Sequence, residues 1–184
     1  MRLILDAEQV TLGIANVARE VLARHPNPDE LVLIGIRRGG VPLAARLAEA
    51  LFTQSGKRVG VGSVDITLYR DDAATALPNP RIGPSQMPGS IDGKCVILVD
   101  DVLFTRRTIR AAFDALFDHG RPAKIELFVL VDRAGAQLPI QPDYRVCKCD
   151  DVSLDERVDV VQQAGSITAL VQPKSAPSIP PPAP

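Results

Sequence analysis

The chain has 184 residues, of which 46% are hydrophobic and 23% charged, and its formal net charge is −1. This length suits one domain with a hydrophobic core of its own. It contains no run of about 18 apolar residues and no N-terminal signal pattern, so a cytoplasmic protein without membrane insertion is expected. Three cysteines exclude a disulfide framework. The charge argues against nucleic-acid binding over the whole surface but leaves room for a local basic face.

The first predicted element is an amphipathic helix. Val10, Ile14, Val17 and Val21 recur at helical spacing, and Asp6 stands at the position of an N-cap. The segment "ELVLIGI" (30–36) is too short for a buried helix and precedes glycines, so it is predicted to be a strand buried on both faces.

Further strands are predicted at 59–68, 95–99 and 125–131, and two more helices lie between them. The core-facing stripes of these helices are predicted from apolar residues at helical spacing: Leu43, Leu47 and Leu51 in one, and Ile109, Ala112, Phe113, Leu116 and Phe117 in helix 108–118. Alternating strands and helices indicate an α/β fold with a parallel sheet that is covered on both faces. Ligands of such sheets bind beyond the carboxyl ends of the strands.

Two segments lack periodicity. Residues 69–93 form a long irregular stretch, which favours a mobile lid over a linker. Residues 172–184 are rich in proline and are predicted to be a disordered tail, which leaves 1–171 as the folded domain.

The segment "VILVDDVLFTRRTIRAAFDAL" (96–116) contains the candidate ligand-binding residues. Asp100 and Asp101 end a predicted strand, and "TRRT" (105–108) begins a predicted helix. A helix N-terminus with hydroxyl and guanidinium donors suits a phosphate monoester, while ionised carboxylates accept hydrogen bonds from vicinal hydroxyls. The combination therefore predicts a ribose 5-phosphate site, the alternative being solvated loop charges that pair with one another.

This segment resembles the phosphoribosyl-diphosphate (PRPP) signature of type I phosphoribosyltransferases. The segments "IGIRRGGVPLAARLA" (34–48), "VDITLYRDD" (64–72), "VDRAGAQLPIQPDY" (131–144) and "DERVDV" (155–160) resemble, in the same order, the PyrR-type family. The resemblance implies about five parallel strands with flanking helices, a small hood and a flexible loop. It further implies conversion of uracil and PRPP to UMP and pyrophosphate, Mg²⁺ bound through PRPP, binding of a leader-RNA hairpin, and a homodimer or higher oligomer.

The resemblance also assigns residues to the site. Asp100 and Asp101 would hold the ribose hydroxyls, and Arg133 would face the site from the hood; these three are the candidate catalytic residues. The segment around the 5-phosphate comprises Val99, Asp100, Asp101, Val102, Leu103, Phe104, Thr105, Arg106, Arg107 and Thr108. The candidate pyrophosphate loop comprises Arg37, Arg38, Gly39 and Gly40, and the lid segment comprises Asp65, Arg70, Asp71 and Asp72.

Three departures from the family pattern keep alternatives open. Arg106 stands where the family usually has glycine, so its guanidinium either replaces an amide contact to phosphate or its Cβ narrows the pocket. The loop reads Arg38-Gly39-Gly40 instead of Thr-Arg-Gly, and residues 145–154 lack the basic, proline-containing stretch that faces RNA. The alternatives are a nucleotide-sensing RNA regulator with decayed transferase activity, and a salvage phosphoribosyltransferase for another base.

Overall fold

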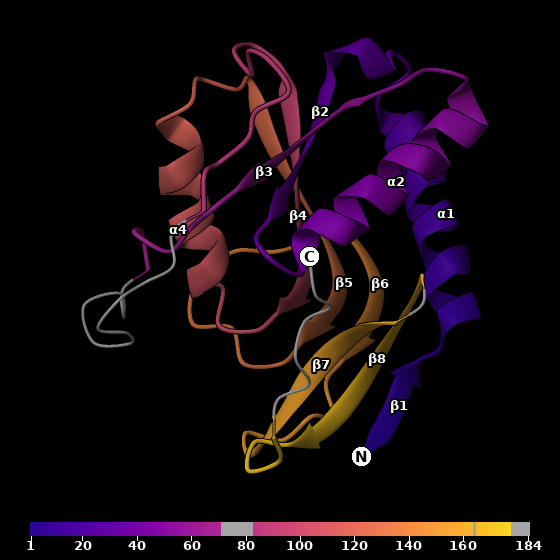
Figure 1. Ribbon diagram of the computed structural model, residues 1–184, viewed down its shortest axis with the longest axis vertical. Helices are drawn as coiled ribbons and strands as arrows, with labels where there is room; N and C mark the ends of the chain where they lie inside the picture. The colour runs from indigo at the N-terminus through magenta and orange to yellow at the C-terminus, as the bar shows by residue number, and fades with distance from the viewer. Residues whose placement is uncertain (71–82, 164, 178–184) are drawn as a thin grey trace.

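The computed structural model describes residues 1–70, 83–163 and 165–177 (Figure 1). Five parallel strands form the main sheet in the order β3-β2-β4-β5-β6. Their bounds are β2 Leu31–Ile36, β3 Gly60–Val64, β4 Cys95–Leu103, β5 Lys124–Arg133 and β6 Tyr144–Cys149. The helices are α1 Ala7–Arg24, α2 Gly40–Ser55 and α4 Arg107–Phe117, with a short 3₁₀ turn, η1, at Pro28–Glu30.

The start of α1 follows from a local sequence signal. The Asp6 carboxylate accepts the Gln9 amide N–H at 2.8 Å, and the Gln9 side chain accepts the Asp6 N–H at 2.9 Å. This reciprocal capping box satisfies two N–H groups at the helix start. The predicted stripe is confirmed, because Val10, Ile14 and Val17 are buried.

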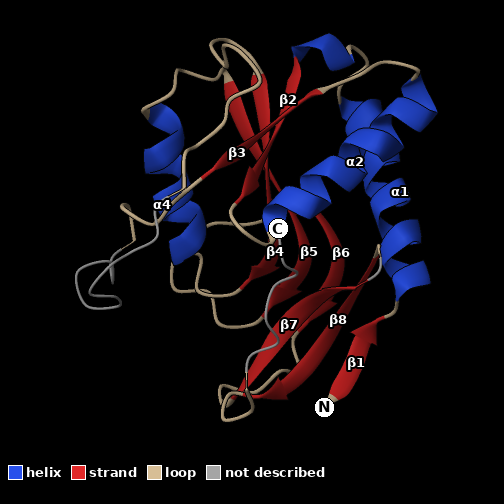
Figure 2. Ribbon diagram, in the orientation of Figure 1, coloured by secondary structure: helices blue, strands red, loops and turns tan. Residues whose placement is uncertain are grey.

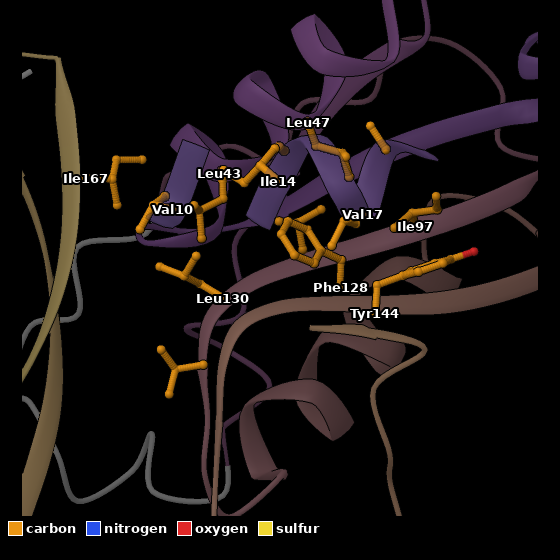
Figure 3. Packing of buried hydrophobic residues seen from close by; sticks show 14 of the residues in the cluster. Val10, Ile14, Val17, Leu43, Leu47, Ile97, Phe128, Leu130, Tyr144 and Ile167 are labelled. Atoms are coloured by element: carbon orange, nitrogen blue, oxygen red, sulfur yellow. The ribbon is translucent and has the colours of Figure 1, made fainter. Parts of the chain in front are cut away.

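The helices cover both faces of the sheet and create two cores (Figure 2). On one face α1 and α2 pack on the strands, and Leu43 and Leu47 of α2 belong to the same buried cluster as Phe128 of β5 (Figure 3). On the other face α4 contributes Ile109 and Leu116. The predicted parallel sheet with helices on both sides is therefore confirmed.

A small antiparallel sheet forms the hood. It consists of β1 Arg2–Leu5, β7 Glu156–Gln163 and β8 Ser166–Pro173 in the order β1-β8-β7. It lies beyond the carboxyl ends of β4, β5 and β6 (Figure 1). A ligand at this edge of the main sheet would therefore lie between the sheet and the hood.

Two predicted strand ends are wrong. The strand expected at 59–68 ends at Val64, because the Asp65 carboxylate accepts the Thr67 N–H at 2.8 Å and closes a turn. The strand expected at 95–99 continues to Leu103, so the acid pair lies within β4 instead of on a turn after it.

Phe117 also departs from the predicted core stripe. It is the last residue of α4, 43% exposed, and its ring lies 5.8 Å from the guanidinium of Arg121. The other members of the stripe face the core as expected.

The first residues of the predicted tail belong to the folded structure. Gln172 and Pro173 belong to β8, and the guanidinium of Arg157 donates to the carbonyls of Lys174 and Pro177 at 3.0 and 2.9 Å. The remainder, 178–184, lies outside the described residues, as does 71–82 of the predicted lid. The described helices include none that is long and apolar enough to cross a membrane.

Candidate active site

The acid pair lies in the last part of β4. Asp100 is buried, and its carboxylate accepts the Asp101 N–H at 3.0 Å, while the Asp101 carboxylate accepts the Val102 N–H at 2.8 Å. Burial, together with the neighbouring Asp101 charge, raises the pKa of Asp100 well above its usual range. Burial also raises the pKa of Asp101. The pair is an electrostatically costly acceptor that a hydroxyl-bearing or cationic ligand would relieve.

The predicted pyrophosphate loop lies directly against this pair. A Cβ at Gly39 would overlap the Asp101 carboxylate, and a Cβ at Gly40 would overlap the carbonyl of Val99. Gly39 has ordinary helical backbone angles, φ −68° and ψ −32°, so glycine is required here by space alone. The structure thus brings two segments that are 60 residues apart in the sequence into contact, as a shared site requires.

Arg37 is the first residue of this loop, and its side chain lies toward Gly83. Its N–H donates to the Val64 carbonyl at 3.0 Å, and its guanidinium occupies the space that a Cβ at Gly83 would need. Burial acts to raise the pKa of Asp65, but hydrogen bonds from Thr67 and Gly83 and the charge of Arg37 outweigh it, so the pKa is lowered. Asp65 therefore organises the turn after β3 and binds the backbone at Gly83, whose N–H donates to its carboxylate at 2.9 Å.

The predicted phosphate loop joins β4 to α4. The N-cap residue Arg106 makes no side-chain cap hydrogen bond, and the Arg107 N–H donates weakly to the Thr105 hydroxyl at 3.4 Å, so the start of α4 offers a cradle of N–H groups to a ligand. The Arg107 guanidinium donates to the Gln137 side chain at 2.8 Å, and the Gln137 N–H donates to the Thr105 carbonyl at 3.2 Å. The loop is thus held from the β5–β6 connection.

The Arg106 guanidinium does not point where a contact to phosphate would need it. Its φ is +75°, a conformation that costs an L-residue roughly 1–2 kcal/mol. The guanidinium turns inward, with 5% of the side chain exposed, and forms an ion pair with Asp132 at 2.8 Å. Its donors are taken by Asp132 and by main-chain carbonyls, so the guanidinium does not extend into the cradle as the expected phosphate contact.

Arg133 is also held by main-chain groups. Its guanidinium donates to the carbonyls of Glu156 and Ser153 at 3.0 Å each and lies 4.1 Å from the centre of the Phe104 ring. Within residues 1–70, 83–163 and 165–177, its buried Nε has no hydrogen-bond partner. Arg133 therefore ties the end of β5 to the start of the hood, beside the phosphate loop.

Residues of the hood that sequence reasoning missed also approach the pair. The negative charge of Asp159 in β7 contributes to the raised pKa of Asp101, after burial. Arg157 donates to Asp159 at 3.0 and 3.1 Å, and the Gln172 amide donates to the same carboxylate. Arg157 and Asp159 lie in the segment "DERVDV" (155–160) that resembles the family, but that resemblance assigned them no role. Their approach to the site depends on the antiparallel pairing of β7 with β8.

The remaining assigned residues differ in what the structure says of them. Val99 and Leu103 are buried in β4, where they are part of the core and position the acid pair. Arg70 is exposed at the start of the lid. Asp71 and Asp72 lie outside the described residues.

A second polar cluster lies toward the amino ends of β4 and β5. Glu126 accepts from Tyr144 at 2.6 Å and from Lys124 at 2.6 Å, and bonds His25 at 2.9 Å; the Cys95 thiol lies close by. Because both carboxylate oxygens already have partners, the cluster is best described as a structural network that ties α1 to β5 and β6.

Comparison with known proteins places the chain in a family. Residues 3–163 match the model of the phosphoribosyl transferase domain. The chain is 49% identical over 157 residues to Bifunctional protein PyrR of Chloroflexus aurantiacus, covering 85% of this chain and 86% of the relative. It is 48% identical to Bifunctional protein PyrR of Geobacter sulfurreducens, covering 89% and 92%. The chain belongs to the PyrR family of phosphoribosyltransferases.

Solved structures support the fold of this PyrR family member. The hypoxanthine phosphoribosyltransferase of Trypanosoma cruzi superposes with a TM-score of 0.67 at 20% identity, covering 95% of this chain and 98% of that one. At this identity the likeness concerns the fold alone. The fold predicted from the resemblance is thereby confirmed.

Proposed function

We propose that the protein transfers a phosphoribosyl group from PRPP to uracil, giving UMP and pyrophosphate. The observation that carries the proposal is the contact between Gly39 and the Asp101 carboxylate, because it joins a candidate pyrophosphate loop to a candidate ribose site. The cradle at the start of α4 lies at the end of the same strand. Membership of the PyrR family supports uracil as the acceptor.

Each element has a role in this proposal. The N–H groups at the start of α4, with the Thr105 and Thr108 hydroxyls, bind the 5-phosphate. Asp100 and Asp101 accept the ribose hydroxyls, and the glycine loop lets its backbone approach the departing pyrophosphate while Arg37 and Arg38 offset its charge. The displacement at C1 passes through an oxocarbenium-like state, so charge stabilisation and exclusion of water carry the catalysis.

The donor set fits a magnesium ion carried in on PRPP. Mg²⁺ is commonly bound by one or two carboxylates together with substrate phosphates. Asp100 is buried and Asp101 half-buried, and both have raised pKa values that a cation would relieve. When bound, the ion neutralises negative charge on the leaving group.

The proposal includes a second activity, uridine-nucleotide-dependent binding of a leader-RNA hairpin that controls pyrimidine genes. The relatives' name, Bifunctional protein PyrR, supports it. We further propose that the protein is cytoplasmic and forms a homodimer or higher oligomer. The favoured alternative is a regulator with decayed transferase activity, for which the substitution of glycine by Arg106 is the motivation.

A base-specificity assay tests the transferase. Purified protein is incubated with PRPP and Mg²⁺ and with uracil, hypoxanthine, guanine or orotate in turn, and the nucleotide product is quantified. We expect UMP and only traces of the other nucleotides. Turnover of another base would show that the acceptor is misassigned, and binding of UMP without any turnover would show that the transferase activity has decayed.

A further inference from the structure

The side chain at position 106 makes contacts that a glycine could not make. Arg106 Nη1 donates to the carbonyl of Phe104 at 2.6 Å and to that of Arg133 at 3.3 Å, and Nε donates to the carbonyl of Ile140 at 3.3 Å. Nη2 donates to the Asp132 carboxylate at 2.8 Å. One planar guanidinium thus binds the phosphate loop itself, the end of β5 and the β5–β6 connection.

The backbone at this position is equally unusual. Among the described residues, Arg106 is the only one other than glycine with a positive φ. Such a conformation persists only where the surroundings over-determine it. The four acceptors of the guanidinium fix the backbone at Arg106. The side chain can reach all four only if the Cβ leaves the backbone in the direction that the positive φ gives it.

We propose that Arg106 is a positioning residue of the phosphate site: its clasp on Asp132 and three carbonyls holds residues 104–107 in the conformation that presents the α4 N–H groups to a 5-phosphate. The inference rests on the proposed function and deepens it. The Arg106 guanidinium is already paired with the Asp132 carboxylate inside the protein. The phosphate is therefore bound by backbone N–H groups and hydroxyls and not by this guanidinium.

The neighbourhood of Asp132 supplies a matched control. Its other oxygen accepts from Arg145 Nη1 at 3.3 Å, and the Arg145 side chain is 44% exposed on β6. Arg145 therefore shares the carboxylate but, in the described part of the chain, forms no hydrogen bond with residues 104–107. Replacing Arg145 removes a cation from Asp132 without removing a bond to the loop.

The experiment compares Arg106→Gly, Arg106→Lys and Arg145→Gln in steady-state UMP synthesis. The 5-phosphate is remote from the reacting carbon, so loosening its cradle removes binding that is uniform along the reaction. We expect Arg106→Gly to raise the KM for PRPP about tenfold or more, with kcat and the KM for uracil changed less than about twofold. Arg106→Lys keeps the charge but not the planar fork, so it should also raise this KM, while Arg145→Gln should leave it unchanged.

Three results would overturn the clasp. The first is an unchanged or lowered KM for PRPP in Arg106→Gly, even if its thermal stability falls, because that is the signature of a purely structural arginine. The second is a wild-type KM in Arg106→Lys, which folds even if the glycine variant does not. The third is an equal rise in Arg145→Gln, which would trace the effect to the charge on Asp132 instead of the loop.

A measurement without turnover separates this inference from the proposed function. Amide hydrogen exchange of residues 104–107 in the ligand-free protein should accelerate in Arg106→Gly and stay unchanged in Arg145→Gln. In titration calorimetry, the affinity for ribose 5-phosphate should fall in Arg106→Gly and stay unchanged in Arg145→Gln. If the wild type makes no UMP but these two readouts change as expected, the function is misassigned and the clasp stands; unchanged exchange in Arg106→Gly refutes the clasp alone.

Discussion

The carboxylate of Asp101 occupies the space beside Gly39 in which a Cβ would stand. Gly39→Ala is compatible with the backbone, which has helical angles there, so the steric conflict decides its effect. We expect the acid pair to be displaced and the affinity for PRPP to fall by about 1–3 kcal/mol, the usual range for overpacking. Titration calorimetry measures it. Gly60→Ala, whose Cβ meets only the Pro88 ring at 3.2 Å, should bind like the wild type, and equal affinity in both variants would contradict the contact.

The two aspartates should be essential for ligand and costly for the empty protein. Asp100→Asn together with Asp101→Asn should weaken binding of PRPP or UMP by about 2–4 kcal/mol, the scale of two charge-assisted hydrogen bonds. Unchanged affinity in calorimetry would disprove the ribose assignment.

The raised pKa of Asp100 predicts how stability depends on pH. Below the unfolded-state pKa of 3.8 the group is protonated in both states. As the pH rises above 3.8, the unfolded chain releases this proton while the folded chain keeps it, so the free energy of unfolding falls until the pH passes the folded-state pKa. Asp100→Asn should therefore be more stable than the wild type at pH 7, and the difference should shrink toward pH 4. Urea unfolding across this range tests it; a less stable Asn variant at pH 7 would count against it.

The Glu126 network should make the free energy of unfolding depend on pH in the opposite direction. Burial acts to raise the pKa of Glu126, but hydrogen bonds from Lys124, Tyr144 and His25 outweigh it and lower the pKa to about 2. Its stabilisation is therefore present above the unfolded value of 4.5 and is lost as the pH falls from 4.5 toward 2. Glu126→Gln should lose about 2–3 kcal/mol of stability at pH 7.

The same variant tests whether this network is separate from the active site. Glu126 is opposite Ile97 in the sheet, toward the amino ends of the strands, whereas the acid pair is toward the carboxyl ends. We expect the KM for PRPP of Glu126→Gln to match the wild type at a temperature where both are folded. A changed KM would reveal coupling across the sheet.

Binding of RNA should be weak and only mildly dependent on salt. By resemblance the RNA-facing positions include Cys147, Cys149 and Asp151. The Lys148 ammonium in the same segment is paired with the Asp150 carboxylate, at 2.6 Å between Nζ and Oδ2. Few phosphates would be neutralised, so log K against log salt should have a slope of about −2 to −4, with roughly micromolar affinity. Filter binding at several salt concentrations, with and without UMP, measures both. Nanomolar, UMP-dependent binding with a steep slope would show that the surface is more basic than its sequence suggests.

Local signals predicted the parts of the fold that depend on neighbours in sequence. Asp6 caps α1, and the apolar stripe with Leu43 and Leu47 faces the core, because capping and helical periodicity act over one or two turns. The hood strands carried no comparable signal. Their pairing joins residues such as Arg2 and Val171, and sequence periodicity says nothing about such distant partners.

The candidate site divides in the same way. The contiguous segment of Asp100, Asp101 and the start of α4 was recognisable, because strand, acid pair and helix start follow one another. The direction of the Arg106 guanidinium was not, since it depends on Asp132, which belongs to the next strand. Asp159 was missed because only the folded hood brings it near Asp101.

The pairing of β1 with β8 has a consequence for synthesis of the protein. Arg2 is synthesised before every strand of the main sheet, but its partner Val171 is synthesised after all of them. The main sheet consists of strands from Leu31 to Cys149 and can begin to form while the chain is still growing. The hood cannot form until β8 has been synthesised, so the nascent chain exposes its phosphate loop without the sheet that later covers it. Until then β1 is an unpaired strand whose edge chaperones or neighbouring chains can bind.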